Sequence, residues 1–184
     1  MKLRLTFFLI LFNNVVYCQL TTDKEKLIEP LMKIDYAEGN SIGLFGVKSE
    51  IYAYFTKIKD SFNNEDLKLL SKNSSNSLVF YSCLELIKRN DSEIVPIYQY
   101  YKQNPLKMEY TNGCIVSTIN MADFIYSQFY SIIKIKDIAE DNLRKLSKNQ
   151  KDYMVWTKIL EESKQKINPV MLNTFSKINE IKNN

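Results

Sequence analysis

Side chains that commonly perform catalysis or bind metals are scarce in this sequence of 184 residues, which contains no histidine. A Ser-His-Asp or Cys-His arrangement therefore cannot form, and the commonest protein ligand of metal ions is missing. Beyond the N-terminal segment the cysteines are Cys83 and Cys114, too few for a four-thiolate zinc site. The sequence predicts no catalytic, metal-binding or cofactor-binding residues, no cofactor and no enzymatic activity.

Acidic residues are the remaining candidates for general acid–base chemistry. They are spread along the chain, and the clusters "NED" (64–66) and "AED" (139–141) fit helix starts, where acids are favoured. A calcium loop would need a glycine and spaced oxygen ligands, which are missing there. Two carboxylates could still meet in the folded chain, so a carboxylate-based hydrolase stays a less favoured alternative.

Tyrosine is the residue type best suited to a binding role. Eleven of the twelve tyrosines follow residue 18, and they are densest in "IYQYYKQ" and "FIYSQFY". We expect most of these rings to lie in the core. A tyrosine ring also offers a large contact area at low entropic cost, which suits protein interfaces. The candidate binding residues are Tyr98, Tyr100, Tyr101, Tyr126 and Tyr130.

The charge balance gives no reason to expect nucleic acid as a partner. Without Lys2 and Arg4, 23 basic residues face 21 acidic ones, a net charge of +2. The densest basic run, Lys145, Lys148 and Lys151, has acids on both sides and no aromatic residue between its lysines. Stacking on bases requires such aromatic residues, so we expect a solvated face and a protein partner.

The N-terminal segment predicts export. "MKLRL" is basic and "TFFLILF" is apolar, but this stretch is far shorter than the roughly 20 residues of a membrane-spanning helix. The pattern is typical of a signal peptide over residues 1–18. Cleavage after Cys18 places Val15 at position −3 and makes Gln19 the first mature residue. We therefore expect a periplasmic or secreted protein with no transmembrane helix in its mature chain.

Two alternatives to simple cleavage remain open. A lipidated Cys18 would anchor the same domain to a membrane, but a small residue usually precedes such a cysteine and here Tyr17 does. An uncleaved, buried helix is the other alternative.

The mature chain has the periodicity of helices. Glycine and proline total only eight, which favours helices over a β-sandwich. Apolar residues recur at helical spacing, with Ser49 as one N-cap and Pro169 at one helix start. The predicted helices cover residues 49–62, 66–72, 77–89, 94–101, 121–134, 149–167 and 169–178, with a further short segment over 137–148. The helix over 77–89 is so apolar that it must be buried nearly all round.

Two segments lack this periodicity. Residues 32–49 hold three of the four glycines, and we interpret them as a loop between helices because the glycine spacing is not that of a phosphate-binding loop. Residues 105–119 alternate around Asn112-Gly113, which predicts a β-hairpin with a type I′ turn and Thr111 opposite Cys114. Its apolar face carries Leu106, Met108, Tyr110, Ile115, Ser117 and Ile119 and should lie on the helices.

This arrangement predicts two free thiols. Cys83 lies in the buried helix, whereas Cys114 falls on the hairpin face that points away from the helices. An oxidising compartment would permit the alternative, a Cys83–Cys114 disulfide closing a loop of about 30 residues.

Residues 67–89, "LKLLSKNSSNSLVFYSCLELIKR", resemble one HEAT-type repeat, an antiparallel helix pair. Val79, Cys83 and Ile87 match the Val, small and Leu positions of its second helix, while Phe80 stands where arginine is usual. Residues 40–130 also resemble a group of small exported bacterial proteins of unknown function. The resemblance implies helix pairs stacked side by side, which expose a continuous binding face.

Together these observations predict one mainly α domain over residues 19–184, built from HEAT-like helix pairs with a hairpin inserted at 106–119. The predicted function is that of a non-catalytic exported binding or scaffold protein of the bacterial cell envelope, acting through a helical-repeat surface. A toxin-neutralising or inhibitor protein is the alternative among binding proteins.

Overall fold

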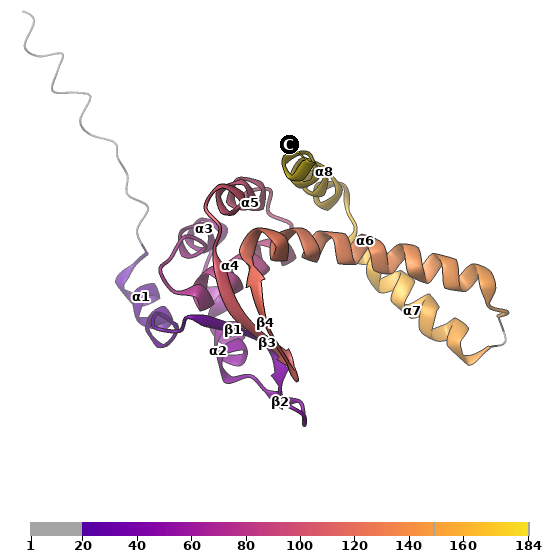
Figure 1. Ribbon diagram of the computed structural model, residues 1–184, viewed down its shortest axis with the longest axis horizontal. Coiled ribbons are helices and arrows are strands. Elements are labelled where there is room, and N and C mark those ends of the chain that lie inside the picture. Colours follow the sequence, from indigo (N-terminus) through magenta and orange to yellow (C-terminus); the bar gives the residue numbers. More distant parts are fainter. Residues whose placement is uncertain (1–19, 149, 184) are drawn as a thin grey trace, which may run out of the picture.

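The computed structural model describes residues 20–148 and 150–183, so the predicted signal peptide, its cleavage after Cys18 and the alternative lipid anchor lie outside the described residues. The elements, in chain order, are α1 (Thr22–Ile28), η1 (Glu29–Leu31), β1 (Tyr36–Ile42), β2 (Val47–Lys48), α2 (Glu50–Ile58), η2 (Lys59–Ser61), α3 (Asn64–Leu70), α4 (Asn76–Lys88), α5 (Ile94–Gln103), β3 (Lys107–Gly113), β4 (Ile115–Asn120), α6 (Met121–Lys145), α7 (Lys151–Lys166) and α8 (Pro169–Asn183). The mainly α class is confirmed, together with a small four-stranded sheet (Figure 1). HEAT-like pairing of the helices stays a prediction.

Side-chain caps start several helices where the sequence predicts them. Ser49 accepts a hydrogen bond from the N–H of Tyr52 at 3.0 Å and begins α2. Asn120 caps α6, which then continues for 25 residues. The prediction of a separate segment over 137–148 is wrong, because no glycine or proline interrupts this stretch and the pair Lys145–Asp141, 2.6 Å apart, supports the helix across one turn.

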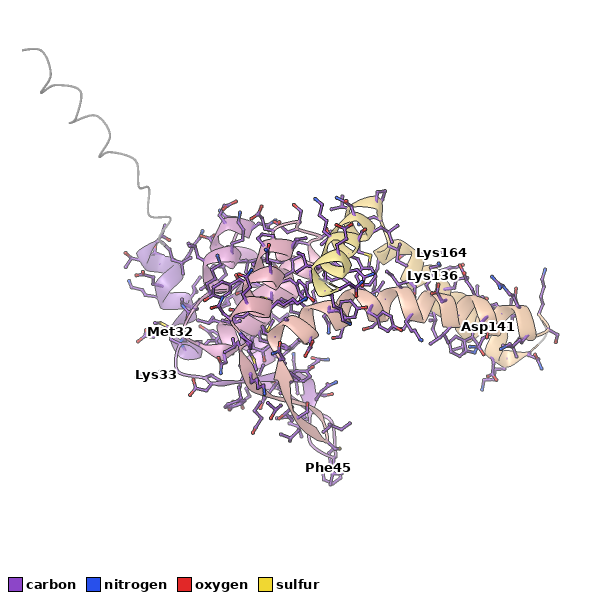
Figure 2. All side chains as sticks on the ribbon, turned by 45° about the horizontal axis from the view of Figure 1, so that its top comes forward. Met32, Lys33, Phe45, Lys136, Asp141 and Lys164 are labelled. Carbon is purple, nitrogen blue, oxygen red and sulfur yellow. The ribbon has the colours of Figure 1, made fainter. Side chains whose placement is uncertain are left out.

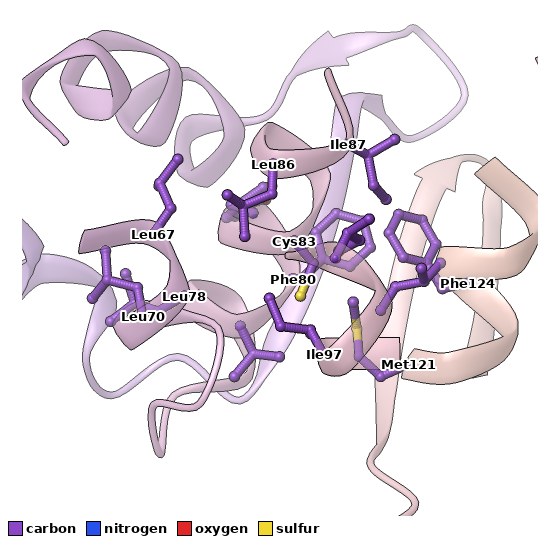
Figure 3. Packing of buried hydrophobic residues seen from close by; sticks show 14 of the residues in the cluster. Leu67, Leu70, Leu78, Phe80, Cys83, Leu86, Ile87, Ile97, Met121 and Phe124 are labelled. Atoms are coloured by element: carbon purple, nitrogen blue, oxygen red, sulfur yellow. The ribbon is translucent and has the colours of Figure 1, made fainter. Parts of the chain in front are cut away.

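Helix α4 forms the centre of the core, as its apolar sequence predicts. Residues 77–83 and 85–87 are buried, and α3, α6 and β1 pack around them. Figure 3 shows Cys83 within this cluster, near Ile97 of α5 and Met121 of α6. The thiol fills a site between three helices and has no disulfide partner.

The prediction of a loop over residues 32–49 is wrong, because this segment contains β1 and β2. The strand order is β2-β1-β3-β4, and β1 pairs in parallel with β3, with Ala37 opposite Tyr110. Gly39 permits this close pairing, since a Cβ atom there would lie 2.4 Å from Oδ1 of Asn112. The strand was missed because its partner lies some 70 residues downstream and its own residues have low β-propensity.

The β3–β4 hairpin is confirmed, but its predicted register is wrong by two residues. Asn112 lies opposite Ile115, so the turn is Gly113-Cys114 and Thr111 faces Val116. Gly113 has φ +57°, a conformation that favours glycine at the first turn position. A shift of two residues keeps every side chain on its predicted face. Burial is confined to the base, where Met108 is buried, whereas Ile115 is exposed.

Helices α6 and α7 form an antiparallel pair that extends away from the rest of the molecule (Figure 1). Helix α8 returns to pack on α5 and α6, where Lys102 donates hydrogen bonds to the carbonyls of Ile181 and Lys182. Within residues 20–148 and 150–183, no helix combines the length and hydropathy needed to span a membrane.

Candidate binding surface at the sheet tip

The structure removes two of the five candidate tyrosines from any binding face. Tyr98 and Tyr101 are buried in α5, and burial raises the pKa of both hydroxyls above the usual value. The hydroxyl of Tyr101 donates to the carbonyl of Ser71 and so joins α5 to the end of α3. The prediction of a binding role is wrong for these two residues, which hold α5 on the core.

The other three tyrosines, Tyr100, Tyr126 and Tyr130, are more accessible, and each ring lies close to a lysine ammonium. Tyr126 and Tyr130 stack on α6 with ring centroids 5.8 Å apart, and Lys182 of α8 lies 3.4 Å from the centroid of Tyr126. Tyr100 is exposed on α5, with the ammonium of Lys72 5.5 Å from its centroid. Exposed rings therefore remain at Tyr100 and at Tyr130, whose centroid lies 5.7 Å from the ammonium of Lys134.

The acids that are buried or half-buried in the described chain each serve a structural contact. Glu85 accepts hydrogen bonds from Lys59 and Arg89, both at 3.1 Å, which raises the pKa of Lys59. Asp66 accepts from the N–H of Asn63 at 2.8 Å in the capping box of α3. No group of three or more Cys, Asp or Glu residues suited to a metal ion occurs within residues 20–148 and 150–183.

Two hollows also lack the features of a carboxylate active site. The one beside α1, of about 740 Å³, is lined by Glu25 and Glu29, but both side chains are exposed and Lys26 lies beside them. Catalytic carboxylates usually need a desolvated position that shifts their pKa. The hollow between α4, α6 and α7, of about 430 Å³, is lined by Leu84, Ile132, amides and two lysines.

A polar cluster around the half-buried Glu38 fixes β1, the strand that leads into the turn with the most exposed apolar residues. The hydroxyl of Tyr81 on α4 donates to the carbonyl of Glu38 on β1 at 2.9 Å, and the N–H of Glu38 donates back at 3.1 Å. Ser49 donates to Oε2 of Glu38 at 2.6 Å while it caps α2. Burial raises the pKa of Tyr81. Strand β1 is thus attached to both α2 and α4.

The turns of the two hairpins lie side by side at the far end of the sheet. Ile42 lies opposite Gly113, and the N–H of Gly43 donates to the carbonyl of Gly113 at 2.8 Å. Figure 2 shows Phe45 at this end, away from the helices. We define the sheet tip as the five exposed apolar residues gathered here: Leu44 (84% exposed), Phe45 (95%), Val47 (61%), Ile115 (70%) and Val116 (60%).

The sheet tip is nearly uncharged. Across residues 40–48 and 111–120, Lys48 is the one charged residue. Gly43 and Gly46 have φ of +72° and +62°, so the backbone of the β1–β2 turn, and not side-chain packing, holds Leu44 and Phe45 outward. Clustered exposed apolar residues of this kind mark interaction sites. The sequence carried one signal of it, a Leu-Phe pair between glycines in a segment expected to be a loop.

No family model, curated protein or solved structure matches the chain. The resemblance to HEAT-type repeats and to small exported bacterial proteins therefore stays a prediction.

Proposed function

We propose that this chain is a non-catalytic, exported binding protein of the bacterial cell envelope and that it binds another protein through the sheet tip. The observation that carries the proposal is the almost fully exposed Phe45, which lies among other exposed apolar residues on a nearly uncharged surface. A large aromatic side chain surrounded by smaller apolar residues has the composition of an interface hot spot. Export and the envelope location are proposed from the N-terminal sequence and the resemblance alone.

A protein partner fits the sheet tip better than a membrane does. Attraction to anionic lipid needs several basic residues beside the apolar ones, and the tip has Lys48 alone. Backbone N–H groups that become buried also need hydrogen-bond acceptors. In the β1–β2 turn the N–H of Gly46 donates to the carbonyl of Gly43, whereas the N–H groups of Leu44 and Phe45 have no backbone acceptor in the described chain. A partner protein can supply these acceptors.

A second candidate function is inhibition of an enzyme or toxin. The shape of the sheet favours it, because Phe45 lies at the end of a narrow projection (Figure 2) that is suited to a concave site. In this case the partner's activity, and not only its location, would depend on the sheet tip.

The test compares Phe45→Ser with Met154→Ser, which removes another large, exposed apolar side chain (76% exposed) from α7. Envelope proteins from the producing cells are captured on the wild-type protein, and a protein that it holds is purified without regard to its binding to either variant. Its dissociation constant is then measured. We expect F45S to weaken binding about tenfold or more, since an anchor of this size contributes roughly 1.5–3 kcal/mol.

Equal dissociation constants for F45S and M154S would overturn the proposal. Loss of binding to anionic vesicles by F45S, without loss of any protein, would assign the tip to lipid instead. Inhibition of the purified partner by wild type, relieved in F45S, would identify the inhibitor function.

A further inference from the structure

The outer edge of β4 is open in the described chain. Strand β4 is the last in the order β2-β1-β3-β4, and residues 115–118 are exposed. The N–H of Met121 donates to the carbonyl of Leu106 in the register of the hairpin. Because bonding direction alternates along a strand, Ser117 and Ile119 bond toward β3, whereas Val116 and Thr118 direct their N–H and C=O groups outward.

This edge lacks the features that usually prevent strands from pairing. Residues 115–120 contain no charge and no proline, and their pairing with β3 has no bulge. The opposite edge of the sheet differs, because β2 has two residues and ends in Lys48. Short, charged edges are protected, while a longer, uncharged and β-branched edge is a template for another strand.

We propose that the occupant of this edge is a second copy of the same chain, whose β4 pairs antiparallel with the first around Ser117. A two-fold axis normal to the sheet requires paired residues to lie on the same face, and this register satisfies it. Ile115 then faces Ile119 of the other copy, and Val116 faces Thr118. The sequence Ile-Val-Ser-Thr-Ile is thus nearly symmetric about its centre.

The register also satisfies the free backbone groups. Val116 and Thr118 are the residues whose N–H and C=O groups point outward, and each Val116–Thr118 pair exchanges two hydrogen bonds as a closely bonded antiparallel pair does. No like charges are brought together, and β-branched side chains meet on both faces. The two sheets join into one continuous sheet of eight strands across two copies.

Ser117 provides the sharpest test because it lies on the axis, opposite its own copy at a Cα separation of about 4.5 Å. It is exposed, so Ser117→Lys and Ser117→Glu leave the monomer folded. Each substitution places two like charges together and should weaken the dimer at least about tenfold. Mixing S117K with S117E pairs opposite charges and should restore it. Asn40→Lys, an exposed site on β1, adds the same charge away from this edge.

The experiment is sedimentation of the exported protein over a range of concentrations, with circular dichroism to verify folding. We expect dimers for wild type and N40K, monomers for S117K and S117E alone, and a mixed dimer for the two together. A wild-type monomer at every concentration, with rapid hydrogen exchange at Val116 and Thr118, would overturn the proposal and leave the edge to a strand of another protein. F45S should leave the dimer intact, so the pairing and the proposed function of the sheet tip can fail separately.

Discussion

Helix α4 and the sheet tip contain similar apolar residues with opposite exposure. Leu78, Val79 and Leu86 of α4 are fully buried, whereas Leu44 and Phe45 of the tip lie almost entirely in solvent. Burial of the first group stabilises the fold, because each large apolar side chain removed from water contributes roughly 1.5–3 kcal/mol. The second group contributes almost nothing in the isolated chain, so any free energy from its burial becomes available when a partner covers it.

The largest expected effect is the difference in the free energy of unfolding between a substitution in α4 and one in the sheet tip. Leu86→Ala removes buried methyl groups and leaves a cavity, which should lower the free energy of unfolding by about 2–5 kcal/mol. Phe45→Ala should change it by less than about 0.5 kcal/mol, as is usual for surface substitutions. Urea unfolding of both variants measures the difference. A destabilisation of several kcal/mol by F45A would show that the tip packs in the isolated chain, which would undermine its assignment as a binding surface.

The sequence predicted the helices better than the sheet, for a physical reason. Periodicity and caps act over a few residues, so the start of α2 at Ser49 and the burial of α4 could be predicted. Pairing of β1 with β3 depends on contacts between distant segments, and the residues of β1 alternate weakly. The hairpin faces were predicted correctly because a shift of two residues leaves every side chain on the same face. The turn was not, because a type I′ turn over Asn112-Gly113 needs a positive φ at both residues and only Gly113 has one.

The candidate site was harder to predict than the fold. Tyrosine density identified five residues, but a buried Tyr98 and an exposed Tyr100 are alike in sequence and differ in which side of α5 they occupy. The sheet tip brings together two turns about 70 residues apart, joined by the bond from Gly43 to Gly113. A single turn with Leu44 and Phe45 predicts little until its neighbour is known.

Alkaline pH should weaken the contribution to stability of the polar cluster that anchors β1, which distinguishes this cluster from the exposed tip. Burial raises the pKa of Tyr81 above its unfolded value of about 10, so its contribution to stability is complete below that pH and is lost as the pH rises toward the folded pKa. Between these values the free energy of unfolding falls by about 1.4 kcal/mol per pH unit for this group.

The measurement is urea unfolding of wild type and Tyr81→Phe at pH values from 8 to above 10. Y81F should lose about 1 kcal/mol at pH 8, because the hydrogen bond to Glu38 is removed, and its stability should fall less steeply at high pH. Because the other titrating groups contribute equally to both curves, the difference in slope reports the contribution of Tyr81. Parallel curves above pH 10 would show that ionisation of Tyr81 does not change the free energy of unfolding, which would contradict the raised pKa.

The contact between β1 and β3 can be tested at Gly39. Gly39→Ala places a Cβ atom against Oδ1 of Asn112 and should cost about 1–3 kcal/mol, as overpacking does. Asn112→Ala removes that oxygen, so the double variant should recover part of the loss in a double-mutant cycle. Additive effects would mean that the cost of the alanine does not arise at Asn112 but at another neighbour, such as the Tyr110 hydroxyl, 3.2 Å from the added atom.

The two cysteines allow the same comparison of a buried with an exposed residue, and here the expected changes in stability are the smallest. Cys83→Ala should cost about 1 kcal/mol, and Cys83→Leu more, because the dense core has no room for a larger side chain. Cys114→Ser at the exposed hairpin turn should change stability by less than about 0.5 kcal/mol.

Burial also raises the pKa of the Cys83 thiol, so a thiol reagent should label Cys114 rapidly and Cys83 only after unfolding. Rapid labelling of Cys83 in the folded protein would contradict the packing of α4, and failure of either thiol to react after denaturation without reductant would indicate a disulfide.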